Sequence, residues 1–387
     1  MLKSSSFFYI MLTEGKVYIM KQNKRESNFE LMRLISMFFI VLYHFLIATG
    51  GDLINHTTGI TTIILEIVAM LIIVHVNSFV LITGYFQCQK KFSWSKTIKL
   101  ISMAWFYKII IGAIFYYFGG VKFNLTNIIL LISPLEFENN WFLTVYISLI
   151  LISPYINIML DKLSQQEHRK LVLLLVVMFS IIPTITNQHT FSNYGFSIIH
   201  FVFVYILGAY LKKYPINENI HFQYYSNKKK IAIFICAFLF CGIFNFLLYE
   251  FCKNIIQINN NNFIVYMSNC ITENMFNYQN PILIVQSISY FLIFETLKVK
   301  NKLINLLASN IFAIYIITEN PYIRGWMYSF LGYDKVFLGP NIILKTIIYS
   351  IIVFIICILI ELLRKLLFRL VSKINYWKTH KLKHNLA

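Results

Sequence analysis

Apolar stretches of about 20 residues recur along the whole length of this chain and are separated by short polar loops. A helix needs about 20 such residues to cross the roughly 30 Å hydrocarbon core of a bilayer. The strands of a membrane barrel would instead alternate apolar and polar residues, and the sequence shows no such alternation. The chain is also 58% hydrophobic and 13% charged, unlike an ordinary soluble domain. The sequence therefore predicts an all-α fold, a polytopic bundle of transmembrane helices.

The loops between these stretches alternate in charge. We expect about ten spans, near residues 31–49, 61–85, 98–118, 141–160, 170–186, 196–211, 231–249, 281–297, 306–322 and 341–363. Lysine and arginine gather before the first span and after every second span, whereas the intervening loops carry few cations. Because cations stay on the cytoplasmic side, this pattern predicts that both termini are cytoplasmic. The net charge of +18 comes from the same clusters, so it indicates topology and argues against nucleic-acid binding.

The predicted spans form one membrane domain, from residue 28 to residue 365. Residues 1–27 are expected to be a cytoplasmic tail. Within it, Met20 opens a basic run typical of a cytoplasmic start, so the residues before it are interpreted as an upstream-start artefact or a disordered tail. Residues 366–387 are expected to be a basic cytoplasmic tail.

The six cysteines make no metal-ligand spacing, so we expect no metal site. Cys252 and Cys270 fall in one predicted outward loop, where they could form a disulfide. The sequence also has no P-loop, no glycine-rich nucleotide fingerprint and no Gly-x-Ser-x-Gly elbow. Candidate chemistry must therefore come from ionisable residues inside the spans.

Arg33 and His44 are two such residues in the first span, with ten residues between them. Eleven steps of roughly 100° bring a helix almost back to its starting azimuth, so both side chains lie on one face. The rise between them is about 16 Å, half the thickness of a hydrocarbon core. Ionisable groups at such depth are costly and usually face a cavity or a protein partner, so the pair predicts a functional site.

Around this pair the chain resembles membrane-bound acyltransferase family 3, whose members O-acylate cell-surface polysaccharides and peptidoglycan. The family opens with an acidic residue, then Leu-x-Arg, ten further residues and a His, and this matches Glu30, Leu31, Arg33 and His44. A small-Gly-Tyr turn, a Trp-Phe-Leu span ending in Ser-Pro, a Leu-Gly helix ending and an Ile-Tyr-x-Ile segment follow in order, at residues 79–86, 141–154, 206–210 and 314–317. The similarity covers nearly the whole predicted membrane domain.

The chain departs from the family's pattern at two places. Thr318 and Glu319 follow the Ile-Tyr-x-Ile segment where the family commonly has a His, so Glu319 could take over its part. Lys96 and Lys99 stand where the family often has arginines after the second span. A lysine meets a phosphate as a point charge and lacks the bidentate fork of arginine. These departures bear on the donor and the acyl group more than on the fold.

The resemblance implies an integral membrane O-acyltransferase. The Lys-, Asn- and Ile-rich composition suggests an AT-rich bacterial genome and hence a bacterial plasma membrane. Such an enzyme would transfer an acyl group, acetyl before succinyl, from cytoplasmic acyl-CoA to a hydroxyl of a surface polysaccharide or its lipid-linked precursor. Acyl-CoA (acetyl-CoA first) would be a co-substrate, with no permanently bound cofactor. The glycan and the lipid bilayer would be the other partners.

Two other functions fit a polytopic membrane protein that serves a surface glycan. A transporter or flippase-like component of polysaccharide export would show broken helices, inverted repeats and midplane charge pairs, none of which is clear in the sequence. A polymerase would have large outward loops rich in arginine and acidic residues, and the loops here are modest.

The depth of the candidate residues is compatible with acyl transfer. Counting along oppositely directed spans puts His44, Glu66 and Glu319 in the outer third of the bilayer. There a histidine could take the hydroxyl proton beside a carboxylate that orients it. Arg33, together with Lys96 and Lys99, lies at the inner edge, where cations could bind the phosphates of acyl-CoA.

Each of these residues also has a structural explanation. His44 could be a hydrogen-bonded helix contact, and Glu66 could make an interhelical hydrogen bond. Arg33 could be an interfacial anchor that snorkels, and Lys96 and Lys99 could be positive-inside charges.

Overall fold

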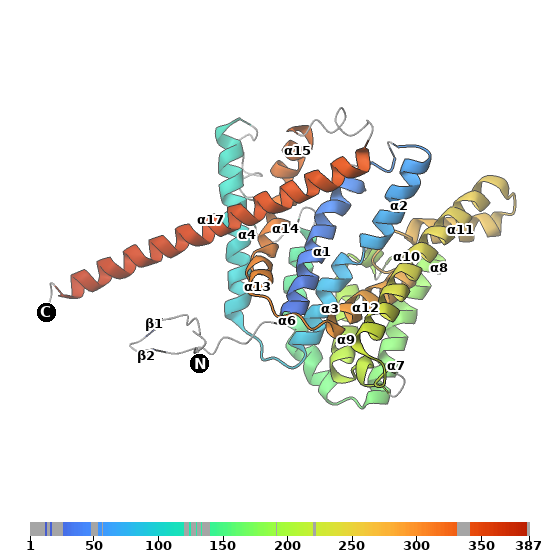
Figure 1. The fold of residues 1–387 in the computed structure, drawn as a ribbon, viewed down its shortest axis with the longest axis horizontal. Coiled ribbons are helices and arrows are strands. Elements are labelled where there is room, and N and C mark those ends of the chain that lie inside the picture. Colours follow the sequence, from blue (N-terminus) through green and yellow to red (C-terminus); the bar gives the residue numbers. More distant parts are fainter. Residues whose placement is uncertain are drawn as a thin grey trace.

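The computed structural model describes most of the chain from residue 26 onwards. The described residues are 26–47, 53–55, 57–119, 124, 129, 133, 140–190, 192–219, 222–330 and 341–384, with two short strands before them. These strands, β1 (Leu12–Thr13) and β2 (Lys16–Val17), pair antiparallel. The rest of the regular structure in these residues is helical, which confirms the predicted all-α class (Figure 1). The suggested start at Met20 lies outside the described residues.

The helices follow one another with short connections. In chain order they are α1 (Ser27–Leu46), α2 (Ile60–Ile72), α3 (His75–Gln87), α4 (Trp94–Tyr117), α6 (Trp141–Asp161), α7 (Gln165–Val176), the π-helix η1 (Val177–Ile181), α8 (Ile182–Thr186), the short η2 (Asn193–Gly195), α9 (Ile198–Lys213), the short η3 (Ile216–Glu218), α10 (Asn227–Ile258), α11 (Asn262–Asn274), α12 (Pro281–Thr296), α13 (Lys302–Ala308), α14 (Ile311–Thr318), α15 (Pro321–Phe330) and α17 (Ile342–His384).

Among the described residues, seven stretches are long and apolar enough to cross a membrane. They are Ser27–Leu46, Ile60–Gln87, Trp94–Tyr117, Trp141–Asp161, Gln165–Thr186, Asn227–Ile258 and Ile342–Val371. Two shorter apolar stretches, Pro281–Thr296 and Lys302–Thr318, join them. The chain is therefore a multi-pass helical protein. The count of ten spans and the cytoplasmic position of both termini stay predictions.

α1 lies inside the bundle, in contact with α2, α3, α12, α13, α14 and α17 (Figure 1). Its first residues are fixed by polar bonds: Ser27 exchanges hydrogen bonds with the backbone of Asn301, and Asn28 donates to the carbonyl of Phe294 at 2.9 Å. These bonds hold the beginning of α1 beside the connection from α12 to α13. α1 and the consecutive helices α13 and α14 therefore run in the same direction.

α2 and α3 form one apolar stretch that breaks at residues 73–74. A break inside a bilayer leaves backbone carbonyls without helical partners, which is costly in lipid. Gln286 of α12 donates its side-chain amide to the carbonyls of Met70 at 3.1 Å and Leu71 at 3.5 Å. Gly242 of α10 makes room for this contact, because a Cβ there would lie 3.0 Å from Nε2 of Gln286. Residues of α10 and α12 therefore stabilise the break between α2 and α3.

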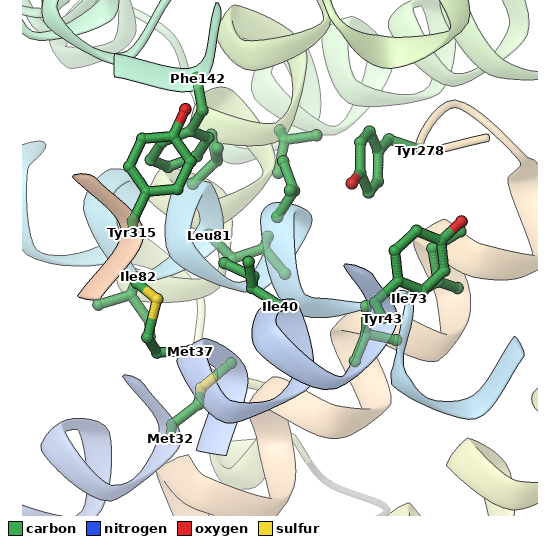
Figure 2. Packing of buried hydrophobic residues seen from close by; sticks show 14 of the residues in the cluster. Met32, Met37, Ile40, Tyr43, Ile73, Leu81, Ile82, Phe142, Tyr278 and Tyr315 are labelled. Carbon is green, nitrogen blue, oxygen red and sulfur yellow. The ribbon is translucent and has the colours of Figure 1, made fainter. Parts of the chain in front are cut away.

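α3 and α9 pack backbone against backbone. A Cβ on Gly84 of α3 would lie 2.2 Å from the carbonyl oxygen of Tyr205, and a Cβ on Gly208 of α9 would lie 2.4 Å from that of Leu81. Only glycine allows so close an approach on both sides of one helix pair. Around this pair the hydrophobic core gathers residues of α1, α3, α6 and α14, among them Met37, Ile40, Leu81, Ile82, Phe142 and Tyr315 (Figure 2).

α10 and α11 form a helical hairpin at one edge of the bundle (Figure 1). Cys252 in α10 and Cys270 in α11 are both buried free thiols. The disulfide that the sequence allowed between them is therefore not formed.

Candidate active site

The ends of α1 and α14 bring His44 and Glu319 together. Nδ1 of His44 lies 2.9 Å from Oε1 of Glu319, and the Glu319 side chain is only 9% exposed. Arg324 of α15 approaches the other carboxylate oxygen, with Nη1 3.7 Å from Oε2. The contact is an ion pair by distance, and Nδ1 makes no hydrogen bond of good geometry among the described residues. A carboxylate that accepts the Nδ1 proton favours the neutral tautomer that carries its proton there, which leaves Nε2 with a free lone pair. The pair can therefore act as a general base.

A second buried imidazole, His75 at the start of α3, lies close by. Its ring centroid is 5.2 Å from that of Tyr43 and 5.7 Å from that of Tyr278, both in edge-to-face geometry, and Figure 2 shows these two tyrosines. His75 is 1% exposed, and neither ring nitrogen has a hydrogen-bond partner among the described residues. Buried polar atoms are normally bonded, so this group has unused hydrogen-bonding capacity beside the residue that precedes His44.

Glu66 lies in a different environment. Its Oε1 is 3.4 Å from Nζ of Lys253 in α10, and the same ammonium is 3.0 Å from Oε1 of Glu250. Among the described residues, Glu66 thus pairs with α10, whereas His44 pairs with Glu319. The catalytic role of Glu66 stays a prediction without a contact to His44 to support it.

A cavity of about 880 Å³ lies beside α1, between α3, α4 and α6. Four cations among the described residues line it, and we call them the basic mouth: Arg33, Lys90, Lys96 and Lys212. Arg33 and Lys96 were predicted from the sequence as phosphate-binding residues. Lys99 is exposed and does not line this cavity, so its predicted role stays a prediction.

The charges of the basic mouth are crowded. Burial lowers the pKa of Lys90, and the neighbouring cations Lys96 and Arg33 lower it further. Glu30 offsets part of this charge, since its Oε1 lies 2.9 Å from Nη1 of Arg33. A ligand with several negative charges would relieve the remaining repulsion.

The cavity becomes apolar away from this mouth, where Met37, Phe79 and Phe142 line it. Thr83 and Tyr146 add the only paired hydroxyls that the described lining shows, 3.1 Å apart. The ring of Phe142 lies 5.5 Å from that of Tyr315 (Figure 2). The carbonyl of Tyr315 accepts the backbone N–H of Glu319. Tyr315 therefore links the apolar end of the cavity to the His44–Glu319 pair.

The acyltransferase-domain family matches residues 26–362. The chain belongs to acyltransferase family 3. This match confirms the resemblance found in the motifs and makes the chain a membrane acyltransferase. The cavity and the His44–Glu319 pair both lie within the matched residues. No curated protein and no solved structure matches the chain.

Several residues of this candidate site were not singled out in the sequence. Lys90 and Lys212 were counted only as topology charges, although Lys90 follows α3 and Lys212 lies in the last turn of α9, the two helices in glycine contact. Arg324 had one available signal, its position five residues after Glu319 with Pro321 between them, which favours a new helix turning back. His75 gave no signal of its own, because nothing in its apolar sequence surroundings sets it apart.

Proposed function

We propose that this acyltransferase moves an acetyl group from cytoplasmic acetyl-CoA to a hydroxyl of a cell-surface glycan or its lipid-linked precursor. The observation that carries the proposal is the arrangement along α1. One half of this helix contributes Arg33 to the basic mouth, and its far end contributes His44 to the pair with Glu319. A site with these two ends suits a donor and an acceptor that arrive from opposite sides of a bacterial plasma membrane.

In the proposed reaction the phosphates of acetyl-CoA bind at the basic mouth, and its thioester arm enters the cavity. The rise of about 16 Å between Arg33 and His44 is then covered by this arm. With ten spans and cytoplasmic termini, the mouth faces the cytoplasm and His44 lies near the outer side, so neither substrate has to cross the membrane.

The chemical step follows from the tautomer of His44. The acceptor hydroxyl donates its proton to Nε2 while its oxygen attacks the thioester carbonyl. Glu319 stabilises the imidazolium that forms. The new C–O bond is complete when the C–S bond breaks, and the thiolate of CoA takes the proton back from His44.

The test uses His44→Ala in the cells that naturally make the protein. We expect the rate of ester formation on the surface glycan to fall by about 10²–10⁴-fold, the usual loss for a general base. The ester content of the glycan reports this loss. His168→Gln is the matched control, because His168 is buried and bonds the Ile206 carbonyl at 3.2 Å, a bond that glutamine can replace. Near-normal esterification by membrane-inserted His44→Ala would disprove the proposed base.

A further inference from the structure

A polar and aromatic cluster lies outside both the cavity and the His44–Glu319 pair, on the loop after α8 and the end of α11. The imidazole of His189 stacks on Tyr194, with ring centroids 3.7 Å apart and planes 26° apart. Asn187 bonds both His189, at 2.5 Å, and Glu273, at 2.5 Å. Tyr194 is 38% exposed and Glu273 is exposed as well. We call these four residues, with Gln279 beneath them, the stacked platform.

The backbone of the platform is held in an unusual conformation. Asn193 and Tyr194 have φ of 42° and 58°, in the left-handed region that bulky side chains rarely adopt. Gly195 follows with φ of 92°, and a Cβ there would lie 2.5 Å from Cβ of Tyr278. The turn is therefore clamped against Tyr278, which fixes where the Tyr194 ring stands. Backbone strain of this kind concentrates at ligand sites.

The polar groups beneath the platform are not fully used. Gln279 is fully buried and donates to Nδ1 of His189 and to Oδ1 of Asn274, both at 2.9 Å. Its side-chain oxygen Oε1 has no hydrogen-bond partner among the described residues. Leaving buried polar atoms unbonded is costly, so Oε1 of Gln279 leaves unused hydrogen-bonding capacity next to the platform.

Buried rings connect the platform to the catalytic pair. Tyr278, the neighbour of Gln279, contacts His75 at 5.7 Å, and His75 contacts Tyr43 at 5.2 Å. Tyr43 directly precedes His44. A molecule held on the platform would therefore stand at the end of a packed path that leads to the base.

We propose that the stacked platform binds a neutral sugar unit of the acceptor glycan. The exposed face of Tyr194 suits the apolar C–H face of a sugar ring. The exposed carboxylate of Glu273, which Asn187 holds in place, suits its hydroxyls, because carboxylate oxygens accept O–H donors. The carboxylate also disfavours an anionic ligand. The identity of the bound sugar as acceptor rests on the proposed function, whereas its binding does not.

The experiment measures binding separately from acyl transfer. Oligosaccharides released from the natural producer's surface glycan and stripped of esters are titrated into the purified full-length protein by calorimetry. We expect Tyr194→Ala to weaken binding by about tenfold, the upper range for one aromatic contact, and Tyr194→Phe to keep it. Glu273→Gln keeps the shape of the side chain and is expected to weaken binding too. Tyr117→Ala, which removes another exposed tyrosine, should have no effect.

Wild-type affinity in folded Tyr194→Ala and Glu273→Gln would overturn the inference. Equal weakening in Tyr117→Ala would overturn it as well, because the effect would then be unspecific. Retained acetyl-CoA binding in all platform variants, measured in the same samples, is the expected result for an acceptor site. Failure of acetyl transfer by the wild-type protein would refute the proposed function and leave the binding result to be judged by itself.

Discussion

Replacing Glu319 by glutamine removes one charge from the catalytic pair and keeps the shape of the side chain. Arg324 can only donate hydrogen bonds, so the amide oxygen is expected to face the guanidinium, where Oε2 now lies 3.7 Å from Nη1. The NH₂ group then takes the position 2.9 Å from Nδ1 of His44. Donation from this NH₂ moves the imidazole proton to Nε2. His44 thereby loses the lone pair that accepts the hydroxyl proton.

The size of the effect follows from this tautomer change. Placing an amide beside a catalytic histidine costs up to about 10⁴-fold, and losing a general base costs about 10²–10⁴-fold. We expect Glu319→Gln to lower the transfer rate by about 10³-fold, or about 4 kcal/mol of transition-state stabilisation. If Arg324 is also changed to glutamine, the amide at 319 can turn its oxygen towards Nδ1. The double variant should therefore recover about tenfold, or about 1.4 kcal/mol.

The assay is transfer from labelled acetyl-CoA to the de-esterified surface glycan by the purified full-length protein. Glu361→Gln is the matched control, because Glu361 is also a buried carboxylate bound to an arginine, at 2.7 Å from Nε of Arg364, but lies outside the proposed site. It should keep its activity per folded molecule. Activity of Glu319→Gln within a factor of about three of wild type would refute the tautomer argument. A double variant that is no better than the single one would refute the role given to Arg324.

The other predictions concern the donor end, the topology and the helix break. Arg33→Ala should weaken acetyl-CoA binding more than Arg33→Lys does, because lysine keeps the charge but not the paired donors, while the exposed Lys162→Ala should leave the affinity unchanged. Equal affinities in isothermal titration would make Arg33 an interfacial anchor only. In a background without native cysteines, Asp52→Cys should react with an impermeant thiol reagent added outside cells and Lys229→Cys should not, and the reverse pattern would contradict the predicted orientation. Gln286→Leu leaves the α2 carbonyls at the break without this side-chain donor and should cost about 1–3 kcal/mol of folding stability. The Tm of the variant should therefore be lower than that of the wild-type protein, and an unchanged Tm would contradict the capping role.

The sequence predicted the helices and a common height for His44 and Glu319, because both depend on local properties. Apolar length marks a span, and counting along it gives the depth of His44 and of Glu319. The depth of a residue does not tell which neighbouring helix its side chain faces. Glu66 was therefore expected beside His44, whereas in the structure it faces Lys253. A carboxylate's partner depends on which helices pack together, and loop charges alone do not encode this.

The basic mouth was predicted in part for the same reason. Arg33 and Lys96 could be placed at the inner edge from the order of the spans, and the structure adds Lys90 and Lys212 to them. These two lysines meet Arg33 only because α3 and α9 lie in backbone contact. The sequence of either helix alone does not predict this contact between α3 and α9, although a glycine in each helix is compatible with it.

The glycine contact between α3 and α9 also has a consequence for biosynthesis. Gly84 leaves the ribosome long before Gly208, so during insertion α3 enters the membrane without the helix that fills its surface. Until α9 arrives, the groove along α3 is covered by lipid or by the insertion machinery. The cavity wall that carries Thr83 and Tyr85 is therefore completed late. We expect nascent chains that stop before α9 to be recognised as unfinished and degraded.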